Sequence, residues 1–143
     1  MTEFRSVTAD FSVAPQLTRE DIARAAQQGF KTLINNRPDG EAPGQLSAAE
    51  AKAAAEAAGL SYKAIQFSGS PPPGVVAATD ALLSAAPGPV LAYCRTGTRS
   101  ITAWAMAQAL SGARTPDEII ALAAEAGYDL SGASGALKGL HPG

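Results

Sequence analysis

The only cysteine of the chain stands in a setting that suits a nucleophile. Cys94 ends the apolar run "PVLAYC" (89–94) and precedes the polar loop "RTGTRS" (95–100), which contains Arg95 and Arg99. A thiol attacks an electrophile as its thiolate, and neighbouring cations stabilise that charge. The two arginines would also attract an anionic substrate. This combination of residues therefore predicts thiolate attack on a small anion.

The loop after the cysteine has the residue types of an anion-binding turn. Gly97 can adopt the positive φ that a tight turn into a helix demands. Successive N–H groups then point inward as a nest, and the N-terminus of the following helix adds partial positive charge. We predict Cys94 as the catalytic nucleophile and Arg99 as the catalytic residue that orients the anion. The other predicted members of the anion-binding loop are Arg95, Thr96, Gly97, Thr98 and Ser100.

A structural role for the cysteine is the simpler alternative. A lone cysteine at the end of a buried strand is often only a small hydrophobic core residue. Such a residue has no need of Gly97 three positions later or Arg99 five positions later. The spacing of these residues therefore favours the nucleophile over the core cysteine.

A second polar loop, "NNRPDGE", follows another predicted strand and should lie at the same edge of the sheet. We predict Asp39 in this loop as a site residue, either a general acid or an ion-pair partner of Arg95 or Arg99. Arg37 would widen the positive rim of the site. The alternative is that Pro-Asp-Gly serves only as a turn.

Short apolar runs alternate with helical periodicity along the chain. Helices are predicted from Thr18 to Gly29, over 47–58, over 75–85, along the stripe of Ile101, Trp104, Ala105 and Ala109, and over 116–126. Strands are predicted over 30–36, 60–67 and 89–94, with 10–16 as a possible edge strand. The Gly-rich tail from Gly127 leaves room for one short helix. This alternation predicts one α/β domain over 1–143, with a mainly parallel sheet of four to five strands and helices on both faces.

Composition narrows the classes of function. The chain has 143 residues, a formal net charge of −2, one cysteine and one histidine, His141. These counts exclude an intrachain disulfide framework and a Cys-rich zinc site, and they do not favour a nucleic-acid-binding protein. No run is long and apolar enough for a membrane helix. We expect a cytoplasmic enzyme without a metal or organic cofactor, and without nucleic acid or membrane as a partner.

Two loop families resemble the stretch "CRTGTRS". The active loop of single-domain rhodaneses, C-R-x-G-x-R-S, is similar, and so is the loop H-C-x-x-G-x-x-R-S/T of tyrosine and dual-specificity phosphatases. Residues 10 to 112 resemble the beta-lactamase hydrolase-like proteins with a phosphatase-like domain (DUF442). That resemblance is carried by "LTREDIARAAQQGFKTLINNRPDGE", "AGLSYKAIQF" and "GPVLAYCRTGTRSITAWAMA".

The family resemblance implies a dual-specificity-phosphatase-like (DSP-like) fold. Family members also occur fused to persulfide dioxygenase domains of the metallo-beta-lactamase type. This implies a link with sulfide oxidation, and a persulfide dioxygenase or another sulfide-oxidation enzyme as a partner.

The loop departs from the phosphatase pattern at three points. Arg99 follows Cys94 by five residues rather than six, and Tyr93 stands in place of the histidine. The loop "FSGSPPPG" lacks the usual aspartic acid. We therefore predict a sulfurtransferase that takes sulfur from thiosulfate or a persulfide and passes it to a thiol acceptor. The alternatives are a phosphatase that forms a phosphocysteine and a non-catalytic module that binds phosphate or sulfate.

Overall fold

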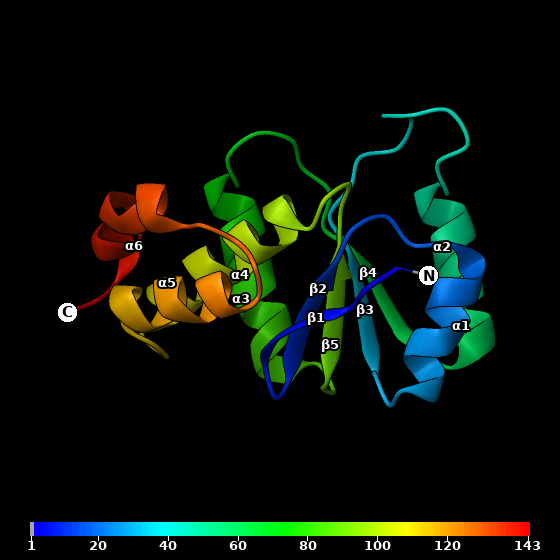
Figure 1. The fold of residues 1–143 in the computed structure, drawn as a ribbon, viewed down its shortest axis with the longest axis horizontal. Coiled ribbons are helices and arrows are strands. Elements are labelled where there is room, and N and C mark those ends of the chain that lie inside the picture. Colours follow the sequence, from blue (N-terminus) through cyan, green and yellow to red (C-terminus); the bar gives the residue numbers. More distant parts are fainter. Residues whose placement is uncertain (1) are drawn as a thin grey trace.

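A five-stranded sheet forms the centre of the computed structural model, which describes residues 2–143 (Figure 1). Its strands are β1 (Arg5–Thr8), β2 (Phe11–Ala14), β3 (Thr32–Asn35), β4 (Ser61–Ala64) and β5 (Val90–Tyr93). The strand order is β1-β2-β5-β3-β4, with β1 and β2 antiparallel and all other neighbours parallel. The predicted α/β fold with a mainly parallel sheet is confirmed.

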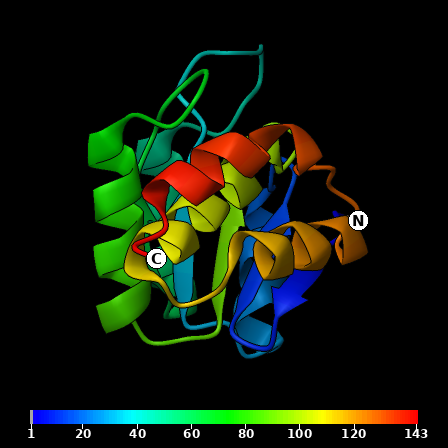
Figure 2. The same ribbon diagram turned by 90° about the vertical axis from the view of Figure 1, so that its left-hand side faces the viewer.

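Helices cover both faces of the sheet. They are α1 (Arg19–Gln27), α2 (Ala48–Ala58), α3 (Pro73–Ala85), α4 (Thr98–Ser111), α5 (Pro116–Glu125) and α6 (Ser134–Leu140), with a 3₁₀ turn over Ser131–Ala133. Helices α1 and α2 pack on one face, and α3 to α6 form the layer on the other (Figures 1 and 2). Thr18, Ser47 and Thr115 are the N-caps of α1, α2 and α5, and each forms a capping box at or beside the predicted helix start. These local signals therefore mark helix starts correctly.

The central strand β5 is apolar on both sides because helices cover both of its faces. Val90 and Ala92 belong to the core under α3 to α6, whereas Leu91 and Tyr93 belong to the core under α1 and α2. Strands β2 and β3 flank β5 in parallel register. The polar residue after β5, Cys94, therefore lies at the middle of the carboxyl edge of the sheet.

The sequence prediction is wrong about the edge of the sheet near the N-terminus. The segment 10–16 was expected to form an edge strand, but β2 is buried throughout and pairs with β5. The edge is instead β1, a four-residue strand that pairs antiparallel with β2. Its length and its mixture of polar and apolar residues give only a weak strand signal.

Asp21 closes the N-terminus of α1 and should contribute to stability at neutral pH. Burial alone would raise the pKa of Asp21, but hydrogen bonds from Thr18 and Arg24 outweigh burial and lower it from 3.8 to about 2. A depressed folded-state pKa gives stability above the unfolded pKa that is lost as pH falls through the folded one. Asp21→Asn should lower the free energy of unfolding at pH 7 by about 1–2 kcal/mol.

Denaturant titrations at several pH values check this expectation. The difference between wild type and Asp21→Asn should shrink between pH 4 and pH 2, because the pKa of Asp21 is about 2 in the folded protein. Asp117→Asn is the control, since Asp117 is exposed at the start of α5 and is not the capping residue. A difference as large at pH 2 as at pH 7 would contradict the assigned role of the Asp21 carboxylate.

Candidate active site

The cysteine lies in a strand-loop-helix turn, as the sequence predicts. Strand β5 ends at Tyr93, and α4 begins at Thr98 with Gly97 as its N-cap residue. Gly97 has a φ of +94° and donates its backbone N–H to Cys94 Sγ at 3.1 Å. The turn therefore directs a peptide dipole and a helix N-terminus at the sulfur.

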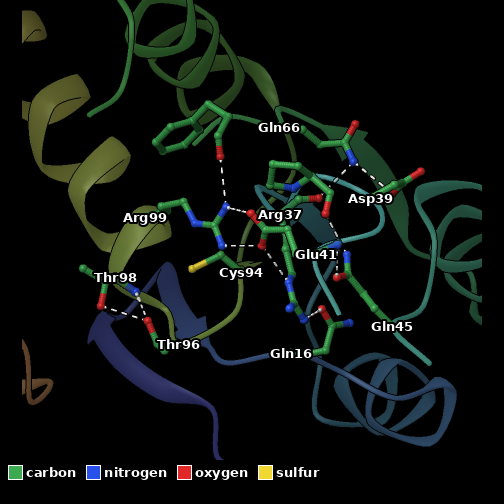
Figure 3. Close-up of polar contacts among 12 residues, drawn as sticks. Gln16, Arg37, Asp39, Glu41, Gln45, Gln66, Cys94, Thr96, Thr98 and Arg99 are labelled. Atoms are coloured by element: carbon green, nitrogen blue, oxygen red, sulfur yellow. Dashed lines mark hydrogen bonds and ion pairs between the residues drawn. The ribbon is translucent and has the colours of Figure 1, made fainter. Parts of the chain in front are cut away.

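Polar groups of the turn surround the buried sulfur. Cys94 is 1% exposed, and its sulfur faces the guanidinium of Arg99 (Figure 3). Ser100 is buried beside the same turn, and its hydroxyl has no hydrogen-bond partner among residues 2–143. The surroundings of Cys94 therefore differ from those of a core cysteine.

Arg99 is held by a residue that the sequence analysis did not single out. Glu41 accepts from Arg99 Nη1 at 2.9 Å and from Nη2 at 2.8 Å, and the carbonyl of Phe67 accepts from Nη1 at 3.1 Å. Hydrogen bonds from Arg99, then from Arg37, outweigh burial and lower the pKa of Glu41 to about 2. The Glu41 hydrogen bonds raise the pKa of Arg99, and the nearby Cys94 adds to that rise. Glu41 is therefore ionised at neutral pH and fixes the guanidinium beside the sulfur.

Two N–H donors of the Arg99 guanidinium are not used by Glu41 or Phe67. A guanidinium carries five N–H groups. The bonds to Glu41 and Phe67 use both protons of Nη1 and one of Nη2. The Nε proton and the second Nη2 proton lie along one edge of the fork, and that geometry matches two oxygens of an oxyanion. Arg99 can thus bind an anion without releasing Glu41.

Arg37 is buried, so its expected place on an exposed rim is wrong. The residue is 4% exposed. Its Nε donates to Glu41 Oε1 at 2.9 Å, and its Nη1 donates to Gln16 Oε1 at 3.0 Å (Figure 3). Glu41 Oε1 accepts hydrogen bonds from both arginines. Arg37 therefore helps to hold the Glu41 carboxylate in the position in which it contacts Arg99.

Asp39 lies near the site loops but does not pair with Arg95 or Arg99, as one expectation required. Its Oδ1 accepts from the backbone N–H of Ala48 at 2.9 Å and from Gln66 Nε2 at 3.1 Å. Figure 3 shows Asp39 on the far side of Gln66 from the sulfur. Asp39 thus fastens its loop to the start of α2, and its role as a general acid stays a prediction.

The remaining predicted loop residues line the open side of the turn. Arg95 is exposed and forms no ion pair with any residue from 2 to 143. The hydroxyls of Thr96 and Thr98 are hydrogen-bonded to each other at 3.0 Å. A second residue that the sequence analysis missed, Tyr128, donates its hydroxyl to the carbonyl of Thr96 at 3.0 Å. No motif surrounds Tyr128, and it follows α5 in the Gly-rich tail.

Within residues 2–143, the His, Cys, Asp and Glu side chains form no group of three or more that could hold a metal ion. The helices described in this range also include none that is long and apolar enough to cross a membrane.

A glycine turn from a central parallel strand into a helix, with its cysteine facing an arginine, is the arrangement of proteins with a cysteine-phosphatase-like fold. Within that class, the chain belongs to the family of the beta-lactamase hydrolase-like protein, phosphatase-like domain, whose model matches residues 3–111. The resemblance inferred from the sequence is thereby confirmed. A beta-lactamase hydrolase-like protein from Agrobacterium fabrum is 37% identical over 127 residues, which is 86% of this chain. The match covers only 29% of that relative, so the chain spans less than a third of its length.

Solved structures agree with this assignment. A candidate phosphatase from Neisseria meningitidis is 34% identical, with a TM-score of 0.83, and the match covers 96% of this chain and 97% of that one. The catalytic core of the PP-IP phosphatase SIW14 from S. cerevisiae, solved with citrate, is 17% identical with a TM-score of 0.65. That match covers 96% of this chain and 84% of the yeast one, and it supports the fold alone.

Proposed function

We propose that the chain is a sulfurtransferase that carries sulfur on Cys94. The thiolate attacks the outer sulfur of thiosulfate, an S–S bond forms, and the S–S bond of thiosulfate breaks as sulfite leaves with the electron pair. The Cys94 persulfide then gives its outer sulfur to cyanide or to a thiolate acceptor, which regenerates the Cys94 thiolate. The free edge of Arg99 holds the sulfonate-like oxygens during attack, while the Gly97 N–H donates to the attacking sulfur.

The observation that carries this proposal is the absence of a free acid beside a short loop. Arg99 follows Cys94 by only five residues, which makes a compact cradle. Among the carboxylates of the adjoining loop, Glu41 is ionised between two arginines and Asp39 accepts two hydrogen bonds away from the sulfur. A poor leaving group needs a proton, and general acid catalysis contributes roughly 10²–10⁴-fold. Sulfite leaves as an anion and does not need that proton.

Phosphate-ester hydrolysis is the second candidate, and the comparisons favour it. The family is named for a phosphatase-like domain, and the similar Neisseria structure is that of a candidate phosphatase. The free edge of Arg99 fits two phosphoryl oxygens as well as two sulfonate oxygens. In this mechanism Cys94 attacks phosphorus, the ester P–O bond breaks as the alkoxide leaves and takes a proton from water, and a further water hydrolyses the phosphocysteine to phosphate and the Cys94 thiolate.

Mass spectrometry of the intact protein separates the two candidates. Treatment with thiosulfate should add one sulfur atom to Cys94, and cyanide should remove it as thiocyanate. Incubation with p-nitrophenyl phosphate tests the alternative fairly, because p-nitrophenolate leaves without a proton. A trapped phosphoryl group with no sulfur adduct would reverse the order of the candidates. Sulfate binding without either adduct would identify a binding module.

The acceptor and the partner are also proposals. We infer that a small thiol accepts the sulfur, because the exposed Arg95 stands at the open side of the turn and would attract its carboxylates. A persulfide dioxygenase would then be the class of enzyme that consumes the persulfide product. Assays with glutathione as acceptor, alone and with such an enzyme added, test this order of events.

Glu41→Gln should impair turnover because the arginine loses its charged partner. Charge-assisted hydrogen bonds are worth about 1.5–3 kcal/mol, so we expect kcat/KM to fall about 10- to 100-fold. The pH profile between 5 and 8 should keep its shape, since the pKa of Glu41 is about 2 and it does not titrate there. Steady-state kinetics of thiocyanate formation provide the measurement.

Asp39→Asn is the matched control for Glu41→Gln, two residues away in the same loop. The asparagine oxygen can still accept from Ala48 and Gln66, so turnover should stay within about twofold of wild type. A loss in Asp39→Asn as large as that in Glu41→Gln would instead support Asp39 as the general acid.

A further inference from the structure

We propose that Tyr128 is a positioning residue for the catalytic loop, supplied by a part of the chain beyond the family match. The match ends at residue 111, whereas Tyr128 follows α5. Its hydroxyl donates to the carbonyl of Thr96 at 3.0 Å, and its side chain lies against Gly97. The proposal rests on the proposed role of Cys94 as the nucleophile, and it holds for either sulfur or phosphoryl transfer.

The carbonyl of Thr96 and the N–H of Gly97 belong to one peptide unit. In a trans peptide these two groups point in opposite directions. The N–H donates to Cys94 Sγ at 3.1 Å, and the carbonyl on the other side accepts from Tyr128. Tyr128 therefore determines which face of this peptide meets the sulfur. A reversed peptide would direct a carbonyl oxygen at the thiolate and would repel it.

This peptide needs an external restraint because Gly97 is the most permissive residue type. Gly97 has a φ of +94° and no Cβ, and a Cβ built there would lie 2.1 Å from the Tyr128 hydroxyl oxygen. The tyrosine thus occupies the space that a side chain would fill. Its hydrogen bond also polarises the peptide, which strengthens the N–H donor on the side of the sulfur.

Arg5 from the opposite end of the chain holds Tyr128 in place. Its guanidinium lies 5.6 Å from the centre of the Tyr128 ring. Its Nη1 also donates to the carbonyl of Ala126 at 3.2 Å, and the backbone N–H of Tyr128 donates to Ala123. The first strand and the C-terminal segment therefore meet behind the catalytic loop and restrain it together.

Tyr128→Phe tests the proposal, because it removes the hydroxyl and keeps the ring. Alkylation of Cys94 by iodoacetamide at pH 7 should slow about threefold to tenfold, the range of one neutral hydrogen bond. Turnover should fall through kcat by a similar factor, with KM for the anion little changed. A purely structural role would lower the melting temperature without slowing alkylation or lowering kcat in the folded protein.

Tyr62→Phe is the matched control, because Tyr62 is also partly buried and its hydroxyl accepts from Asn35 Nδ2 at 3.1 Å. Its alkylation rate and kcat should equal those of wild type. An unchanged alkylation rate in Tyr128→Phe, or an equal loss in Tyr62→Phe, would overturn the proposal. Alkylation requires no substrate, so this result is independent of whether the protein transfers sulfur.

Discussion

Cys94→Ser should reduce both thiocyanate formation and p-nitrophenol release to the rate of the buffer control. The chain has no other cysteine, so no second thiol can replace the nucleophile. Within residues 2–143, the side chain that faces residue 94 is the guanidinium of Arg99, which cannot act as a general base for a serine hydroxyl. The loss should therefore exceed that of any other single substitution in the site.

Anion binding separates loss of chemistry from loss of the fold in Cys94→Ser. The free edge of Arg99 remains, so calorimetry should still detect sulfate or thiosulfate. Removal of the thiolate charge beside Arg99 should if anything strengthen the binding of a divalent anion. Turnover that survives in Cys94→Ser would show that the nucleophile lies elsewhere. Loss of turnover together with anion binding and the melting transition would point to unfolding instead.

The sequence was sufficient to predict the part of the site whose residues are contiguous along the chain. Cys94, Gly97 and Arg99 lie within one turn, so an apolar strand, a glycine and a helix start place them together whatever surrounds them. The same reasoning located the loop after β3 at this edge, because parallel strands share their carboxyl end. Figures 1 and 2 show the loops after β3 and β4 at the same end of the sheet.

Side-chain direction within an irregular loop could not be predicted from the sequence. Asp39 and Glu41 are two residues apart, and neither a strand nor a helix period says which one faces Arg99. In the structure Arg99 donates to Glu41, which is 58 residues away in sequence. Asp39 instead accepts from the backbone N–H of Ala48 at the start of α2. Which carboxylate pairs with Arg99 depends on how the loop folds over the edge of the sheet, and that is a property of the tertiary structure.

The role of Tyr128 could not be predicted from the sequence either, because its contact with the catalytic loop also depends on the tertiary structure. The contact joins residues 32 positions apart, and it depends on the packing of α5 beside α4. A tyrosine in a Gly-rich tail carries no periodic or motif signal of its own. The N-terminal strand β1 was not predicted either. The two segments that restrain the catalytic loop, one at each end of the chain, were therefore the parts predicted least well.

Gly97→Ala should be the most damaging substitution in the site that leaves Cys94 and Arg99 intact. A non-glycine residue at a φ of +94° is strained, and the added methyl group would lie 2.1 Å from the Tyr128 hydroxyl oxygen. The backbone strain alone costs about 1–3 kcal/mol. Relief of the clash must move either Tyr128 or the peptide that donates to the sulfur. A displacement of about 1 Å in such a donor can cost about 100-fold in rate, so we expect at least that loss in kcat/KM.

Gly59→Ala is a control that separates the loss of stability caused by backbone strain from the loss of turnover caused by a change in the site. Gly59 ends α2 with a φ of +85°, and a Cβ built there has nothing within 4 Å. It should lose about 1 kcal/mol of stability, measured by denaturant unfolding, and keep full turnover. Combining Gly97→Ala with Tyr128→Phe should recover only a small part of the lost stability, because the hydroxyl is gone but the ring carbon Cζ still lies 2.9 Å from the added methyl group. The rate should not recover, because the peptide is no longer held. Wild-type turnover in Gly97→Ala would mean that the orientation of this peptide does not matter for catalysis.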